Sequence, residues 1–210
     1  TSPQPEHTNS VSYATMRQWV DALREVSANT TATAAPVPAG PDDEPTITLP
    51  SGTSSTSPAI VKFDLGTSGT VAIPGGTQFY GLLIVKVPAG WDGGSHAAIK
   101  FNGNSALHGI VYLEMETLGP NANAGTELIR INGGGNETQL TGSIIADVRS
   151  KGGFTAASKT VVRINGGGAS PPGIAYSAEG VNMVRTVVGT PTGTSYRTLG
   201  YKTTGALNIQ

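Results

Sequence analysis

The chain of 210 residues contains no cysteine, so disulfide bonds, cysteine-based metal sites and cysteine nucleophiles are excluded. Charged residues are also scarce, at 13%, and aromatic residues make up only 6%. No apolar run approaches the roughly 18 residues of a membrane-spanning helix. The first residues, Thr-Ser-Pro, resemble no signal peptide, and the missing initial Met favours a processed or trimmed form. We therefore expect membrane contact only through a segment outside this chain.

Glycine and proline are abundant, with 29 and 14 copies, which fits a turn-dense β protein better than disorder. Their distribution predicts three regions. Residues 1–45 hold an N-terminal helix and a Pro/Thr-rich connector, residues 46–190 hold the β domain, and residues 191–210 form a C-terminal strand or tail.

Two short motifs recur about once per thirty residues. The first places a basic residue between apolar neighbours, followed two positions later by Asp or Asn, in the segments Ile60–Asp64, Ala98–Asn102, Leu128–Asn132 and Val161–Asn165. The second begins with glycine, in the segments Gly81–Val85, Gly109–Leu113, Gly142–Ala146 and Gly173–Ser177. A period of this length is the signature of a repeat fold.

The repeated segments are short, rich in Val, Ile, Phe and Tyr, and bounded by Gly, Asn or Pro, as strands are. A propeller blade needs a longer repeat, and hairpins need tighter turns than the variable gaps between the motifs. Stacked parallel turns of chain tolerate such gaps, because an insertion bulges out at a corner. We therefore predict a parallel β-solenoid (β-helix), of either hand, with about four to five coils.

Alternation along each strand predicts which side chains face the core. In the basic motif, the apolar neighbours should face inward, while Lys62, Lys100, Arg130 and Arg163 form one outward column. The Asp and Asn that follow should mark a corner, where they hydrogen-bond backbone groups. After each repeat glycine, every second residue should be interior, and the outward set is also apolar: Ile84, Tyr112, Ile145 and Tyr176.

An apolar outward row needs a cover. The candidate is one amphipathic helix at residues 12–28, whose Met16, Trp19, Val20, Leu23 and Val26 recur at spacings of three and four. We expect this helix to pack along the side of the solenoid.

Charge is unevenly spread. Residues 1–50 carry two basic against six acidic side chains, whereas residues 149–210 carry seven basic against one acidic. An anion-binding strip for phosphate or carboxylate polymers is therefore one interpretation of the basic column, and a solvated face is the other. The candidate polyanion-binding residues are Lys62, Lys100, Arg130, Arg163, Arg149 and Lys151.

Catalysis has little support. Glu114 and Glu116 lie two apart on one expected strand, which is typical of a solubilising face rather than a glycosidase pair. His7, His96 and His108 share no metal-ligand spacing, and Ser55, Ser57 and Ser95 stand beside no base in a known motif. We expect a non-enzymatic protein without a metal or cofactor.

A run of motifs resembles the exported region of PilX-like accessory pilins. In that family a Gly-x-Leu-Val-Val strand, an Asn-Gly-Asn turn, a His-Gly-Leu-Ile-Tyr strand and a Gly-Ala-φ-φ-Ala strand follow in order. Here the counterparts are Gly81–Val85, Phe101–Asn104, His108–Tyr112 and Gly142–Ala146. The region is also similar to the solenoid of Thermus-type competence-associated minor pilins, proposed as DNA receptors. The match covers about residues 46–150 and the repeat at 161–177, and it lacks the hydrophobic N-terminal pilin helix.

The resemblance implies a bacterial, extracellular or cell-surface component of a type IV pilus, with a role in adhesion or in DNA uptake during competence. Its expected partners are other pilin subunits or filament components and, as ligand, DNA or an acidic polysaccharide. Two alternatives remain open at this point: a structural fibre or adhesin, and a polysaccharide-acting β-helix enzyme.

Overall fold

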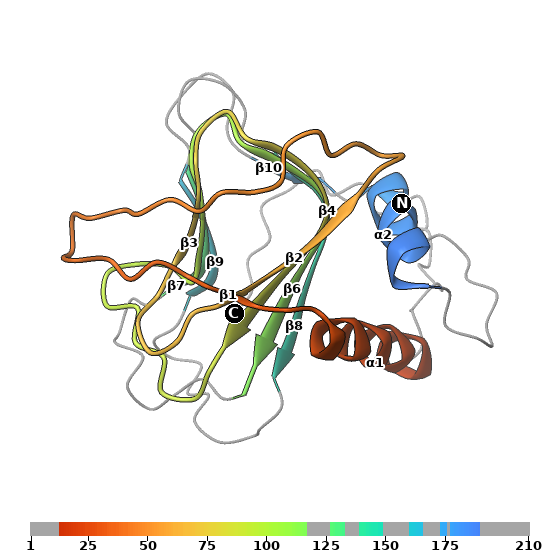
Figure 1. Ribbon diagram of the computed structural model, residues 1–210, viewed down its shortest axis with the longest axis horizontal. Coiled ribbons are helices and arrows are strands. Elements are labelled where there is room, and N and C mark those ends of the chain that lie inside the picture. The colour runs from red at the N-terminus through yellow and green to blue at the C-terminus, as the bar shows by residue number, and fades with distance from the viewer. Residues whose placement is uncertain are drawn as a thin grey trace, which may run out of the picture.

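The computed structural model describes residues 13–116, 127–132, 139–148, 160–165, 173–175 and 177–189. This part of the chain is mainly β, with two parallel sheets and two helices (Figure 1). The six-stranded sheet has the order β1 (Thr33–Ala34), β2 (Ala59–Asp64), β4 (Gln78–Val87), β6 (Ala106–Met115), β8 (Gln139–Val148) and β10 (Gly173–Ala175). The four-stranded sheet has the order β3 (Val71–Ile73), β5 (Ile99–Phe101), β7 (Glu127–Asn132) and β9 (Thr160–Asn165).

From β2 onward, successive strands alternate between the two sheets. Each strand of the larger sheet pairs in parallel with the next strand of that sheet, and the smaller sheet is built in the same way. The two sheets face each other, as Figure 1 shows. Every two strands, the chain therefore returns to the sheet it left and adds one strand to it.

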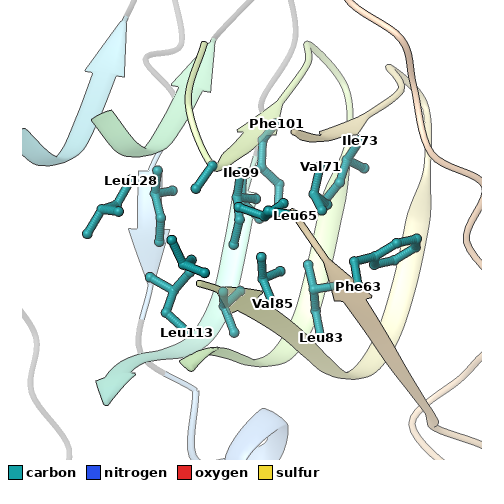
Figure 2. Packing of buried hydrophobic residues seen from close by; sticks show 14 of the residues in the cluster. Phe63, Leu65, Val71, Ile73, Leu83, Val85, Ile99, Phe101, Leu113 and Leu128 are labelled. Atoms are coloured by element: carbon teal, nitrogen blue, oxygen red, sulfur yellow. The ribbon is translucent and has the colours of Figure 1, made fainter. Parts of the chain in front are cut away.

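The main core lies between the two sheets. Leu83 and Val85 of β4 point toward Ile99 and Phe101 of β5 (Figure 2), and all four side chains are fully buried. Their positions confirm the alternation expected from the sequence, in which every second residue of a motif faces inward. Fully burying side chains of this size contributes about 1.5–3 kcal/mol each.

Three of the repeat glycines are aligned across neighbouring strands of the six-stranded sheet. Gly81, Gly109 and Gly142 occupy one row across β4, β6 and β8, with φ angles between +144° and +149°. A Cβ atom at any of the three would lie within 2 Å of a backbone oxygen on the preceding strand. Each position of the row therefore requires glycine, because any side chain would clash with the backbone of the preceding strand.

The fourth repeat glycine departs from this row. Gly173 pairs with Gln139 rather than Gly142, a shift of three positions. An odd shift exchanges the two faces of a strand, so Ile174 lies in the inward row of Leu140. The equivalence assigned to the Gly173–Ser177 segment was therefore wrong in register, and Tyr176 lies outside the described residues.

Helix α1 (Tyr13–Asn29) confirms the expected amphipathic helix and covers the outer face of the six-stranded sheet. The prediction of a single helix was wrong, however, because α2 (Ala178–Val188) covers part of the same face (Figure 1). The second, smaller core beneath them contains Leu23 of α1, Met183 and Val184 of α2, and Ile84 and Tyr112 of the sheet. Two helices thus cover the described part of the apolar outer row, in which Ile84 and Tyr112 are buried and Ile145 is partly buried.

The connector contributes to the sheets. Strand β1 lies before residue 46 and pairs with β2, and Thr46 forms a bridge with Ala72. Ala35 and Ile47 are buried in the main core. The C-terminal segment 191–210, where a last strand or tail was expected, lies outside the described residues.

Candidate functional site

Of the four cations predicted to form one column, three do so: Lys100, Arg130 and Arg163. Strand pairing places Lys100 of β5 beside Arg130 of β7, and Arg130 beside Arg163 of β9. Adjacent parallel strands are about 4.8 Å apart. The column of Lys100, Arg130 and Arg163, called the basic column below, is therefore confirmed as a geometric feature.

Lys62 was wrongly assigned to this column. Its strand β2 belongs to the six-stranded sheet, where Ala59 pairs with Gly81 and Lys62 pairs with Ile84. The first strand of the smaller sheet is the three-residue β3, in which Ala72 holds the position next to Lys100. The sequence pattern misled because β2 resembles the basic motif in composition, while β3 has no cation to mark it.

Carboxylates neutralise much of the basic column. Lys100 pairs with Glu44, and the Arg130 Nε atom pairs with Glu127. The other oxygen of the Glu127 carboxylate lies 2.8 Å from Arg163 Nη1. Two carboxylates thus offset three cations, and the group keeps a net charge of +1.

Glu127 is the member of this site that sequence reasoning missed. Its side chain is only 3% exposed, yet it binds both arginines of the column. Alternation along a strand assigns residues 127 and 130 to opposite faces, so no sequence signal indicated the contact. A buried carboxylate paired with two guanidinium groups fixes the side chains of both.

Exposure differs along the column. The side chains of Lys100 and Arg130 are 12% and 21% exposed, whereas that of Arg163 is 57% exposed. Arg130 also donates to the Ser95 carbonyl oxygen at 3.0 Å. Arg163 therefore offers most of the surface that a ligand could reach.

An asparagine pair borders the column, but it is joined through side chains and not through the backbone hydrogen bonds that the corner motif predicted. The side-chain amide of Asn165 donates to the Asn132 side-chain oxygen at 2.9 Å, and Arg163 Nε donates to Asn165. Asp64 does not belong to this row, because it lies on β2 in the other sheet. Arg149 and Lys151, the remaining candidate residues, lie outside the described residues.

Lys62 instead holds α1 in place. Its Nζ atom donates to the Ser27 carbonyl oxygen in the last turn of the helix at 2.6 Å, and lies 3.8 Å from Glu114 Oε2. A cation there compensates the partial negative charge of the helix C-terminus. α1 has no basic residue of its own in its last turn, so β2 supplies one.

Carboxylates of the six-stranded sheet also bind α1. Glu114 is buried and accepts a hydrogen bond from the Ser27 hydroxyl. Asp147 is buried as well and accepts two hydrogen bonds of 2.7 Å from Arg24, which raise the pKa of that guanidinium. The expectation that Glu114 belongs to a solvated face was therefore wrong, whereas Glu116 is exposed.

His96 and His108, the two histidines within the described residues, do not belong to a cluster of metal ligands. The ring of His96 contacts the Gly40 carbonyl oxygen at 3.1 Å, and His7 lies outside the described residues. Among the residues placed by the structure, no group of three or more His, Asp or Glu side chains has the geometry of a metal site. His108 stacks on Tyr80 with ring centroids 4.3 Å apart.

Burial lowers the pKa of His108 below its usual value, and the nearby carboxylate of Glu179 on α2 partly opposes this shift. Tyr80 of β4 is the other titratable group packed against the ring. A histidine whose pKa is lower in the folded than in the unfolded state binds fewer protons when folded. Its contribution to stability is complete above the unfolded pKa near 6.5 and is lost as the pH falls through the folded value.

We therefore expect the free energy of unfolding to fall on acidification below about pH 6.5, and His108→Phe to remove part of this dependence while keeping a ring against Tyr80. Urea unfolding of both proteins at several pH values measures the difference. An unchanged pH profile in the variant would contradict a partly buried His108 whose pKa is lowered by desolvation.

Neither helix in the described part of the chain has the length and apolar character of a membrane span.

The described part of the fold has these distinctive polar features: the basic column, the carboxylates beneath α1, and the ring pair of Tyr80 and His108. Comparison with known proteins yields no matching family model, curated protein or solved structure.

Proposed function

We propose that this chain is a non-enzymatic bacterial surface protein, the exported part of a PilX-like minor pilin, folded as a parallel β-solenoid of about four to five coils. The alternation of strands between two parallel sheets supports the solenoid, because each pair of strands then makes one coil. Its partners are other pilin subunits, and its location is the cell surface.

The motifs that carry the resemblance support this assignment. Gly81–Val85, His108–Tyr112 and Gly142–Ala146 form the matching parts of β4, β6 and β8 in one common register. The intervening Asn-Gly-Asn turn contains Asn104, whose φ of +64° is left-handed. Asn adopts that conformation more readily than most residues do. The motifs thus correspond to one repeated structural unit rather than to scattered similarities.

For the ligand, we propose a polyanion such as DNA or an acidic polysaccharide, bound along the basic column. The observation that carries this proposal is the register of Lys100, Arg130 and Arg163 across three strands. Because Glu44 and Glu127 offset two of the three charges, binding is modest, on the order of the non-specific range of 10⁻⁴–10⁻⁶ M.

Labelled single- and double-stranded DNA, titrated at two ionic strengths, tests the proposal. Each neutralised phosphate releases counterion, so affinity falls steeply with salt. Replacing Lys100, Arg130 and Arg163 together by Ala should reduce the log–log salt slope by about one to two units. Glu127→Gln, which removes the shared counter-charge but keeps the side-chain shape, should instead strengthen binding.

Lys86→Ala is the matched control, because Lys86 lies in the other sheet and pairs with Asp64 at 3.5 Å. It should leave the salt slope unchanged. An absence of binding at low salt, or binding indifferent to the triple replacement, would reject the polyanion ligand and leave adhesion or a structural fibre as the function.

A further inference from the structure

A second, unrelated site lies on the outer face of the six-stranded sheet, where α2 begins. A pocket of about 280 Å³ is lined by Tyr80, His108 and Thr141 on its floor and by Ser55, Ser177, Glu179, Gly180 and Met183 around it. The three floor residues form one row across β4, β6 and β8, each directly before a glycine of the glycine row.

The floor of the pocket consists of two stacked rings and a threonine. Tyr80 and His108 lie nearly parallel, 17° apart, and form the first two places of the row. The third place holds Thr141, which has no ring. The face of the His108 ring turned away from Tyr80 is therefore directed toward the strand of Thr141, where a third ring would continue the stack.

The pocket is large enough for such a ring. An apolar cavity of roughly 150 Å³ accommodates benzene, and this pocket has about 280 Å³. Offset stacking of planar rings is favourable by about 0.5–1.5 kcal/mol beyond the buried area. A planar ligand would thus gain a contact that a flexible aliphatic chain of equal size cannot make.

The charged and polar groups around the pocket indicate which substituent a bound ring should have. Glu179 is an exposed carboxylate at the rim, and no Lys or Arg is among the described residues that line the pocket. The Ser177 side chain caps α2 by accepting a hydrogen bond from the Gly180 N–H at 3.1 Å. One of the backbone N–H groups at the helix N-terminus therefore already has an acceptor within the protein. These groups favour a hydrogen-bond donor or a positive charge and disfavour an anion.

We propose that this pocket binds a planar aromatic ring bearing an amino group, stacked on His108 with its amino group directed to the Glu179 carboxylate. The site does not depend on the polyanion proposal, since the basic column belongs to the other sheet. A weakly buried, partly open site of this size corresponds to a dissociation constant on the order of 1 mM.

Three probes separate the contributions of ring and charge: tryptamine has both, 3-indolepropionate has the ring with a carboxylate, and butylamine has only the ammonium. NMR titration of the histidine ring signals reports contact at His108. Tryptamine should shift these signals in a saturable way, and each of the other two should bind several-fold more weakly.

Three variants locate the binding. Thr141→Phe should abolish tryptamine binding by placing the protein's own ring in the third position. His108→Phe should retain binding, which is followed through the indole signals of tryptamine because this variant has no ring signal at position 108. Glu179→Gln should reduce the preference for tryptamine over 3-indolepropionate by about threefold to fivefold. Equal binding of the two indoles, no saturable shift with tryptamine, or unaltered binding to a folded Thr141→Phe variant would each overturn the proposal.

Discussion

Replacing Gly109 by alanine is expected to lower the free energy of unfolding by about 4 kcal/mol or more, or to prevent folding. The residue has a φ of +144°, and an added Cβ would lie 1.9 Å from the Gly81 carbonyl oxygen. The clash is with backbone, so no side-chain rotation relieves it. β6 lies between β4 and β8, and relief would require both pairings to shift. Urea unfolding monitored by circular dichroism measures the loss.

Gly76→Ala is the control that separates backbone conformation from crowding. Gly76 also has a positive φ, +79°, but a Cβ added there would have no other atom within 4 Å. Left-handed geometry costs a non-glycine residue about 1–2 kcal/mol. A Gly109→Ala variant no less stable than Gly76→Ala would show that the glycine row is dispensable.

The sequence allowed the strand periodicity and the basic column to be predicted, because both depend on alternation within short strands. Ile99, Lys100 and Phe101 show why: the flanking apolar residues are fully buried and the lysine is not. The assignment of Lys62 failed because composition does not determine which sheet a strand joins. That depends on the whole path of the chain, including the cation-free strand β3.

Helix α2 was missed because its sequence contains weak helix formers. Gly180 and the β-branched Val187 and Val188 lower helix propensity, and the Val pair reads as a strand. The segment is helical because tertiary packing overrides this low propensity. A Cβ at Gly180 would come within 3.0 Å of the Thr141 carbonyl oxygen, so glycine lets α2 approach the glycine row closely. The pocket, which needs both α2 and the sheet, could not be predicted without this helix.

The buried carboxylates were missed for a different reason. Charged residues on a strand are usually solvated, and that expectation was applied to Glu114. Here the outer face of the sheet is covered, and Glu114, Asp147 and Lys62 each find a partner on α1. Such pairings depend on how the helix is placed over the sheet, which no local pattern encodes.

These polar contacts lead to the second large expected effect. Asp147→Ala should lower the free energy of unfolding by about 2–4 kcal/mol, because it removes a buried carboxylate that accepts hydrogen bonds from a charged donor and from a buried hydroxyl. The carboxylate is 6% exposed, accepts two hydrogen bonds from Arg24, and accepts a third from the Tyr112 hydroxyl at 2.8 Å. The loss should be concentrated at α1, where hydrogen exchange of the helix amides would accelerate.

A double-mutant cycle with Arg24→Ala isolates the pair. Arg24 is 38% exposed, but its replacement should also be costly, because it removes the cation that pairs with the buried Asp147 carboxylate. Arg17→Ala is the matched control on the same helix, since Arg17 is 61% exposed, pairs with Asp21 only at 3.8 Å, and should cost under about 0.5 kcal/mol. Strictly additive effects of Arg24 and Asp147 would show that the pair has no coupling energy and that α1 is held by its apolar side chains instead.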